Sequence, residues 1–107
     1  MLKKCTWLLK KKERSIISST LSMNLTIMEF KILTVFSQNF RQPMSHYSIA
    51  ERIEKNPNTY KGIGMCISRL NKKFKKLTRG DRLFISIRNE GFYLKRIVIP
   101  FEEIFHI

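Results

Sequence analysis

The chain has few cysteines, which can cross-link a fold, and few glycines and prolines, which end helices and strands. Its 107 residues include four glycines, three prolines and two cysteines. Cys5 and Cys66 are far apart, and His46 and His106 each stand alone. This pattern disfavours a disulfide framework and a metal site, both of which need clustered ligands or paired cysteines. We therefore expect free thiols in a reducing cytosol and no metal or other cofactor.

Acidic residues are also scarce. The chain has 21 Lys and Arg residues against 8 Asp and Glu residues, which gives a formal net charge of +13. Such an imbalance predicts attraction to a polyanion: DNA, RNA or an anionic membrane surface. Hydrophobic residues make up 43% of the sequence, enough for the core of one small domain, which argues against general disorder.

Long apolar runs are missing. The N-terminal residues 1–12 begin like a signal peptide, but their apolar run is shorter than the roughly seven to fifteen residues of an h-region. No stretch approaches the roughly 20 apolar residues of a membrane span. We expect a cytoplasmic protein with no membrane partner. Nor is there a Gly-rich phosphate loop or a visible nucleophile–base pair, so we expect no enzymatic activity.

The first part of the chain predicts strands and then a helix. Residues 6–9 and 14–18 are β-rich runs around a lysine-rich turn, which indicates a small antiparallel sheet. Thr26 and Glu29 then have the spacing of a capping box, in which each side chain binds the other's backbone amide. A helix from Ile27 to Gln38 follows. It is apolar around much of its girth, as a central helix is.

Two more helices follow a break at Pro43. Ser45 is a suitable N-cap for a helix over residues 46–54, and residues 56–58 form a turn. A third helix is predicted to begin near residue 59 or 60. Its inward stripe, with spacings of four, three and four, consists of Ile63, Ile67, Leu70 and Phe74.

The opposite side of this third helix is cationic. Met65, Arg69, Lys72 and Lys76 repeat the same spacing, and no acidic residue occurs between Lys61 and Arg79. A helix face that is merely solvated usually mixes signs, with Glu placed to pair with Lys. Both interpretations stay open, but we favour a polyanion-binding face, because unneutralised self-repulsion destabilises a fold.

The C-terminal part predicts a hairpin. Residues 83–88 and 92–94 are β-rich runs around a turn in which Asn89 and Gly91 both tolerate positive φ. Strands, three helices and a hairpin, in this order, are the layout of a winged helix. The predicted fold class is α+β: a winged helix-turn-helix with an N-terminal antiparallel sheet, three helices and a C-terminal β-hairpin wing.

Four motifs in this order resemble the DNA-binding effector domain of OmpR/PhoB-type response regulators. They are Leu25-Thr26 with Glu29, Met44-Ser45, Ile67-Ser68-Arg69-Leu70 with Lys72-Lys73, and Arg88 through Gly91-Phe92-Tyr93-Leu94. Residues 7–9 are similar to the opening of the one-component, CadC- or ToxR-like branch. The resemblance implies a winged-helix DNA-binding domain over residues 1–94, with its core at about 7–94, and a C-terminal apolar extension over residues 95–107.

The resemblance also implies a function. The chain would be a sequence-specific DNA-binding transcription regulator of a bacterium, with the third helix in the major groove of double-stranded DNA and the wing in the adjacent minor groove. Arg69 suits guanine, Asn71 suits adenine and Arg88 suits a narrow minor groove, although each of them can instead hold phosphate or lie on the surface. The implied DNA-contacting residues are Lys61, Cys66, Ser68, Arg69, Asn71, Lys72, Lys73, Lys75, Lys76, Arg88 and Asn89.

The sequence departs from the family pattern at the start of the third helix. Gly62 and Gly64 fall where the family usually has Thr and Asp, and each glycine costs a helix about 1 kcal/mol relative to alanine. We expect this part to fray until it binds DNA, or to start late. Cys66, Asn71 and Asn89 replace residues that are common in the family, which predicts a different base preference.

Several partners are compatible with this reading. The resemblance implies a homodimer on tandem half-sites and a contact with RNA polymerase or a related regulator. The short chain leaves no room for a receiver domain, so control by abundance, a partner or another signal is expected. The alternative is a protein-interaction module that pairs with and modulates a related regulator or polymerase while binding DNA weakly. An RNA-binding role is a third possibility.

Two segments have two open interpretations each. Residues 95–107 either cover the core or form a protein contact. The second basic cluster is either a DNA-touching arm or a solvated turn, and it consists of Lys3, Lys4, Lys10, Lys11, Lys12 and Arg14.

Overall fold

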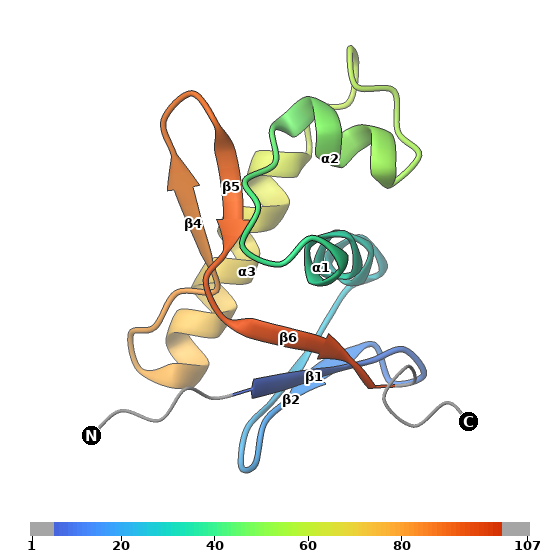
Figure 1. Ribbon diagram of the computed structural model, residues 1–107. Coiled ribbons are helices and arrows are strands. Elements are labelled where there is room, and N and C mark those ends of the chain that lie inside the picture. Colours follow the sequence, from blue (N-terminus) through green and yellow to red (C-terminus); the bar gives the residue numbers. More distant parts are fainter. Residues whose placement is uncertain (1–5, 102–107) are drawn as a thin grey trace.

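The computed structural model describes residues 6–101. Cys5, His106, the first two lysines of the basic cluster and residues 102–107 of the extension lie outside this part. In chain order the elements are β1 (Thr6–Lys10), β2 (Ser15–Ile17), β3 (Ser22–Asn24), α1 (Ile27–Gln38), α2 (His46–Arg52), α3 (Ile63–Thr78), β4 (Phe84–Ile87), β5 (Gly91–Leu94) and β6 (Ile97–Pro100) (Figure 1). The predicted winged helix-turn-helix fold is confirmed.

One sheet forms the base of the molecule. Its strand order is β3-β2-β1-β6, in which β1 is antiparallel to β2 and parallel to β6. The N-terminal antiparallel sheet was predicted, but β3 and β6 were not. Strand β6 uses residues of the C-terminal extension: Val98 pairs with Trp7, and both side chains are buried. This part of the extension therefore belongs to the sheet and covers the core.

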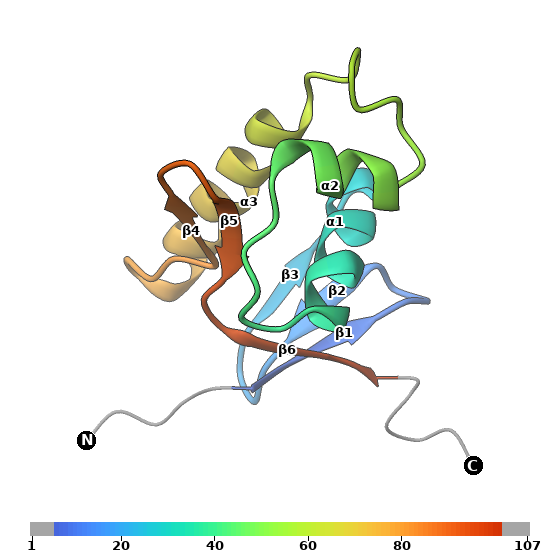
Figure 2. The same cartoon turned by 45° about the horizontal axis from the view of Figure 1, so that its top comes forward.

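Helix α1 lies between this sheet and α2 (Figure 2). Its predicted bounds and its capping box are confirmed: the Thr26 hydroxyl accepts from the Glu29 amide at 3.1 Å, and the Glu29 carboxylate accepts from the Thr26 amide at 2.8 Å. Ile32, Leu33 and Phe36 are fully buried. The apolar girth of α1 thus places it in the centre of the core, as its sequence predicts.

The other two helices differ from their predicted bounds. Helix α2 ends at Arg52 instead of residue 54, because Glu54 has a φ of 63° and turns the chain out of the helix. Helix α3 begins at Ile63 instead of residue 59 or 60. The amides of Thr59 and Tyr60 both bind the Asn56 carbonyl, at 3.2 and 2.9 Å, and form a separate turn before the helix. Of the two predicted outcomes, the late start is the one observed.

Strands β4 and β5 form the predicted wing. Asn89 and Gly91 have φ values of 67° and 109°, which allow the turn. The wing is fastened to the α1–α2 loop, since Met44 and Phe92 exchange two backbone hydrogen bonds of 2.7 and 2.9 Å. A side chain at residue 91 would collide with the Met44 carbonyl group, so this close approach requires glycine there.

Candidate nucleic-acid interface

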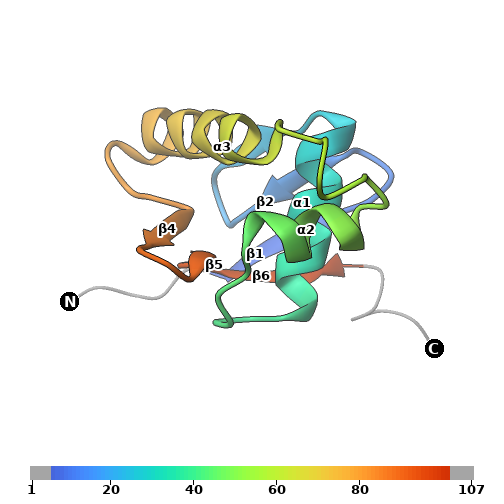
Figure 3. The same ribbon diagram turned by 90° about the horizontal axis from the view of Figure 1, so that it is seen from above.

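Helix α3 runs along one side of the molecule with the wing beside it (Figure 3). The predicted inward stripe is confirmed, because Ile63, Ile67, Leu70 and Phe74 are all buried. Its other side is exposed and carries no acidic residue. The exposed residues of this side are Met65, Ser68, Arg69, Lys72, Lys75 and Lys76, and we call them the outer face of α3.

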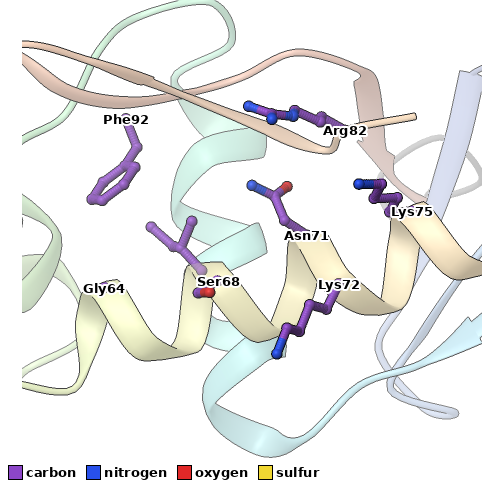
Figure 4. Close-up of a pocket in the computed structure, with 8 residues that line it drawn as sticks. Gly64, Ser68, Asn71, Lys72, Lys75, Arg82 and Phe92 are labelled. Atoms are coloured by element: carbon purple, nitrogen blue, oxygen red, sulfur yellow. The ribbon is translucent and has the colours of Figure 1, made fainter. Parts of the chain in front are cut away.

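A cationic cleft of about 320 Å³ separates α3 from the base of the wing. Lys72 and Lys75 line it from α3, and Arg82 lines it from the segment before β4 (Figure 4). The Arg82 side chain extends above Asn71, toward Phe92 at the other end of the cleft. Sequence reasoning did not single out Arg82. The sequence feature that could have identified it is a basic residue placed between the end of α3 and the first strand of the hairpin.

Asn71, predicted to read adenine, is bound to the wing. Its side-chain oxygen accepts from the amides of Leu83 and Phe84 at 3.1 and 2.8 Å, and its side-chain nitrogen donates to the Phe84 carbonyl at 3.1 Å. Both ends of the amide group are thus used within the fold. These bonds hold the first strand of the wing against α3.

Lys73, one of the implied DNA-contacting residues, turns toward the sheet. Its ammonium group donates to the Glu29 carboxylate at 2.8 Å and to the Asn24 carbonyl at 2.6 Å. Glu29 is only 3% exposed, and its carboxylate also serves the α1 capping box. Lys73 therefore neutralises a buried charge and joins α3 to α1 and β3.

Cys66 is buried on the side of α3 that faces α1. Burial raises the pKa of its thiol from 9.0 to about 11, and the nearby negative charge of Glu29 adds to the increase, against the opposing charges of Arg69 and Lys73. A thiol of this kind is protonated near neutral pH and is a poor nucleophile. Cys66 packs within the fold.

The remaining predicted residues lie on the surface. Lys61 is exposed just before α3, and Arg88 and Asn89 are exposed at the tip of the wing. A hollow of about 350 Å³ separates the wing tip from the start of α2 and is lined by Arg88 and His46, among others. The imidazole ring of His46 packs edge-on against Phe92, with 5.1 Å between the ring centroids.

The second basic cluster lies elsewhere. The β1–β2 turn, which carries Lys11, Lys12 and Arg14, is on the opposite side of the molecule from the wing (Figures 1 and 3). Lys10 lies 3.9 Å from the Glu13 carboxylate and above the Phe101 ring. In the described part, this cluster is separate from the outer face of α3.

Two further findings concern only residues 6–101. None of their helices is long and apolar enough to cross a membrane. Their His, Cys, Asp and Glu side chains form no group of three or more that could hold a metal ion.

Comparison with known proteins identifies a matching family. The family model described as "Transcriptional regulatory protein, C terminal" matches residues 20–94. No match is found among proteins with curated functions.

Several solved structures have similar folds at sequence identities below a quarter. The DNA-binding domain of CpxR from E. coli is 22% identical, with a TM-score of 0.67 over 92% of this chain and 95% of that one. The Klebsiella pneumoniae RstA DNA-binding domain, solved in complex with the RstA box, is 16% identical, with a TM-score of 0.68 over 87% and 94%. The DNA-binding domain of E. coli CadC is 14% identical, with a TM-score of 0.66 over 92% and 96%.

Proposed function

The chain belongs to the OmpR/PhoB-type family of transcriptional regulatory DNA-binding domains, and on this premise we propose that it regulates transcription by reading a specific DNA sequence. Helix α3 enters the major groove, and the wing enters the adjacent minor groove. The observation that carries this proposal is the outer face of α3, which is exposed, cationic and free of acidic residues beside an exposed wing arginine. The similar RstA domain was solved bound to its DNA box, which supports the same use of the fold here.

The lysines of α3 and the cleft supply affinity. Lys72, Lys75 and Lys76 neutralise phosphates and release counterions, which favours binding with little choice of sequence. The cleft between α3 and the wing lies where a DNA backbone passes from the major-groove element to the minor-groove element. We place one phosphate there, between Lys75 and Arg82.

The arginines supply choice of sequence. Arg69 has the length and the two parallel donors that fit the O6 and N7 acceptors of guanine. Arg88 at the wing tip suits a narrow, electronegative minor groove. We assign contacts with the DNA backbone or with base edges to the remaining exposed residues, which are Lys61, Ser68 and Asn89. Cys66, Asn71 and Lys73 have supporting roles in this proposal, because their side chains are buried or bound within the fold.

Two copies on tandem half-sites are part of the same proposal. Selected sites would then contain a direct repeat about one helical turn apart, roughly 10 base pairs. The regulator acts on nucleoid DNA in the cytoplasm. Contact with RNA polymerase or with a related regulator remains a prediction.

The test is selection of binding sites from random duplex DNA at two salt concentrations, followed by sequencing of what stays bound. We expect an enriched motif that blurs in Arg69→Ala and Arg88→Ala. Arg52→Ala is the charge-matched control, because Arg52 is exposed at the end of α2 and not on α3 or the wing. Its motif should be unchanged. Salt-sensitive binding without a motif would indicate a non-specific binder, and no binding near physiological salt would favour the protein-interaction alternative.

A further inference from the structure

Met65 is the most exposed large apolar side chain in the described part of the chain, at 59%. It lies on α3 one turn before Arg69 and two turns before Lys72, opposite the buried residues Ile63 and Ile67. A single exposed apolar residue on a protein surface is ordinary and needs no explanation. Met65 differs because it stands at the N-terminal end of the outer face of α3, in line with the cationic side chains that begin at Arg69.

The neighbours of Met65 leave it room to reach outward. Three of the nearest positions on this part of the helix are small: Gly62, Gly64 and Ser68. The nearest charged side chains are four residues away on either side: Lys61, which precedes the helix, and Arg69 within it. The thioether therefore stays largely exposed, at the edge of a hollow that Met28 and Tyr60 also line. Its unbranched, polarizable chain adapts to irregular apolar surfaces.

The major groove offers one apolar group on its base edges, the 5-methyl group of thymine. A thioether cannot supply the hydrogen bonds that the other base edges present, but it can pack against this methyl group. We propose that Met65 contacts a thymine methyl group in the major groove and makes thymine the preferred base at that position. This inference rests on the proposed function. One helical turn separates Met65 from Arg69, so the thymine lies about one or two base pairs from the guanine that Arg69 reads.

The test uses the duplex found by selection, with each thymine replaced in turn by deoxyuridine, which lacks only the methyl group. At one position in each half-site, the affinity of the wild-type protein falls about fourfold, the ratio expected for one buried methyl-sized group. Met65→Ala binds the thymine and uracil duplexes equally at that position. Met65→Leu keeps the preference, because its side chain is still apolar and long.

Phe40→Ala is the control variant. Phe40 is 38% exposed and belongs to the loop between α1 and α2. This loop follows the end of α1 that lies away from α3 (Figure 3). Its thymine preference should match that of the wild type. The inference is overturned if no thymine shows a uracil penalty, or if the penalty persists in Met65→Ala. If selection yields no motif, the proposed function and this inference fail together. A motif without methyl dependence removes only this inference.

Discussion

The side chain of Asn71 and the backbone of Phe84 are joined by two hydrogen bonds, one in each direction, of 2.8 and 3.1 Å. This pairing connects the middle of α3 to the first strand of the wing. If α3 lies in one groove and the wing in the next, the pairing fixes how far apart the two reading elements stand. Asn71 then positions the wing and does not read a base.

We expect Asn71→Leu to destabilise the fold without changing the bases that are selected. The amides of Leu83 and Phe84 would lose their acceptor, and a buried donor without a partner costs about 1–3 kcal/mol. Urea unfolding measures this loss, and Ser68→Ala, on the outer face of the same helix, is the control. A changed preference for adenine at unchanged stability would instead assign Asn71 to base reading.

Lys73 and Lys72 are adjacent lysines with different predicted roles. Lys73→Met should lower the free energy of unfolding by about 3 kcal/mol, the low end for a broken buried ion pair, because Glu29 is buried but Lys73 is partly exposed. It should leave the salt dependence of DNA binding unchanged. Lys72→Met should do the reverse and reduce the slope of log K against log salt by about one. Equal effects of the two variants on that slope would contradict the assignment.

Much of the fold could be predicted from local patterns. The Thr26 and Glu29 spacing gave the start of α1, and the period of the apolar residues gave the buried stripe of α3. Strand β6 could not be predicted, because its parallel partner β1 lies about ninety residues earlier, and no local signal specifies such a pairing. The predicted start of α3 was too early because Thr59 and Tyr60 belong to a separate turn, in which both amides bind the Asn56 carbonyl.

The sequence predicts on which side of α3 each residue lies, but not which group its side chain binds. Periodicity places Lys73 and Asn71 on the flanks of α3, at the border between core and solvent. Whether a flanking residue reaches outward or inward depends on what the neighbouring elements present. A buried carboxylate draws Lys73 inward, and unpaired wing amides draw Asn71. These groups come from distant parts of the sequence, so helix spacing alone gives no sign of them.

The removal of β6 should destabilise the whole domain. A chain ending after Arg96 would expose the buried surface around Trp7 and lose Val98, whose burial alone is worth about 1.5–3 kcal/mol. Thermal unfolding followed by circular dichroism measures the change. A chain ending after Phe101 is the control, because it keeps β6. Equal melting temperatures for the shorter chain and the full one would show that β6 adds little.

Cys66 should react slowly with iodoacetamide in the folded protein and rapidly in denaturant, as followed by peptide mass spectrometry. The pKa of its thiol is raised by burial to about 11. The folded state therefore retains a proton that the unfolded state releases. Its contribution to stability is present below pH 9.0 and is lost as the pH rises toward about 11. Cys66→Ala should flatten that decline, and an unaltered decline would assign it to other groups.

The most direct test of the central claim is methylation interference with dimethyl sulfate on a selected duplex. The reagent methylates guanine N7 in the major groove and adenine N3 in the minor groove, so one experiment reports both grooves. We predict that major-groove methylation blocks binding at the guanine read by Arg69, and that minor-groove methylation blocks it in the flanking segment reached by Arg88. Each block should disappear in the matching alanine variant. Binding that tolerates both modifications, or a pattern unchanged in both variants, would contradict the placement of α3 and the wing in the two grooves.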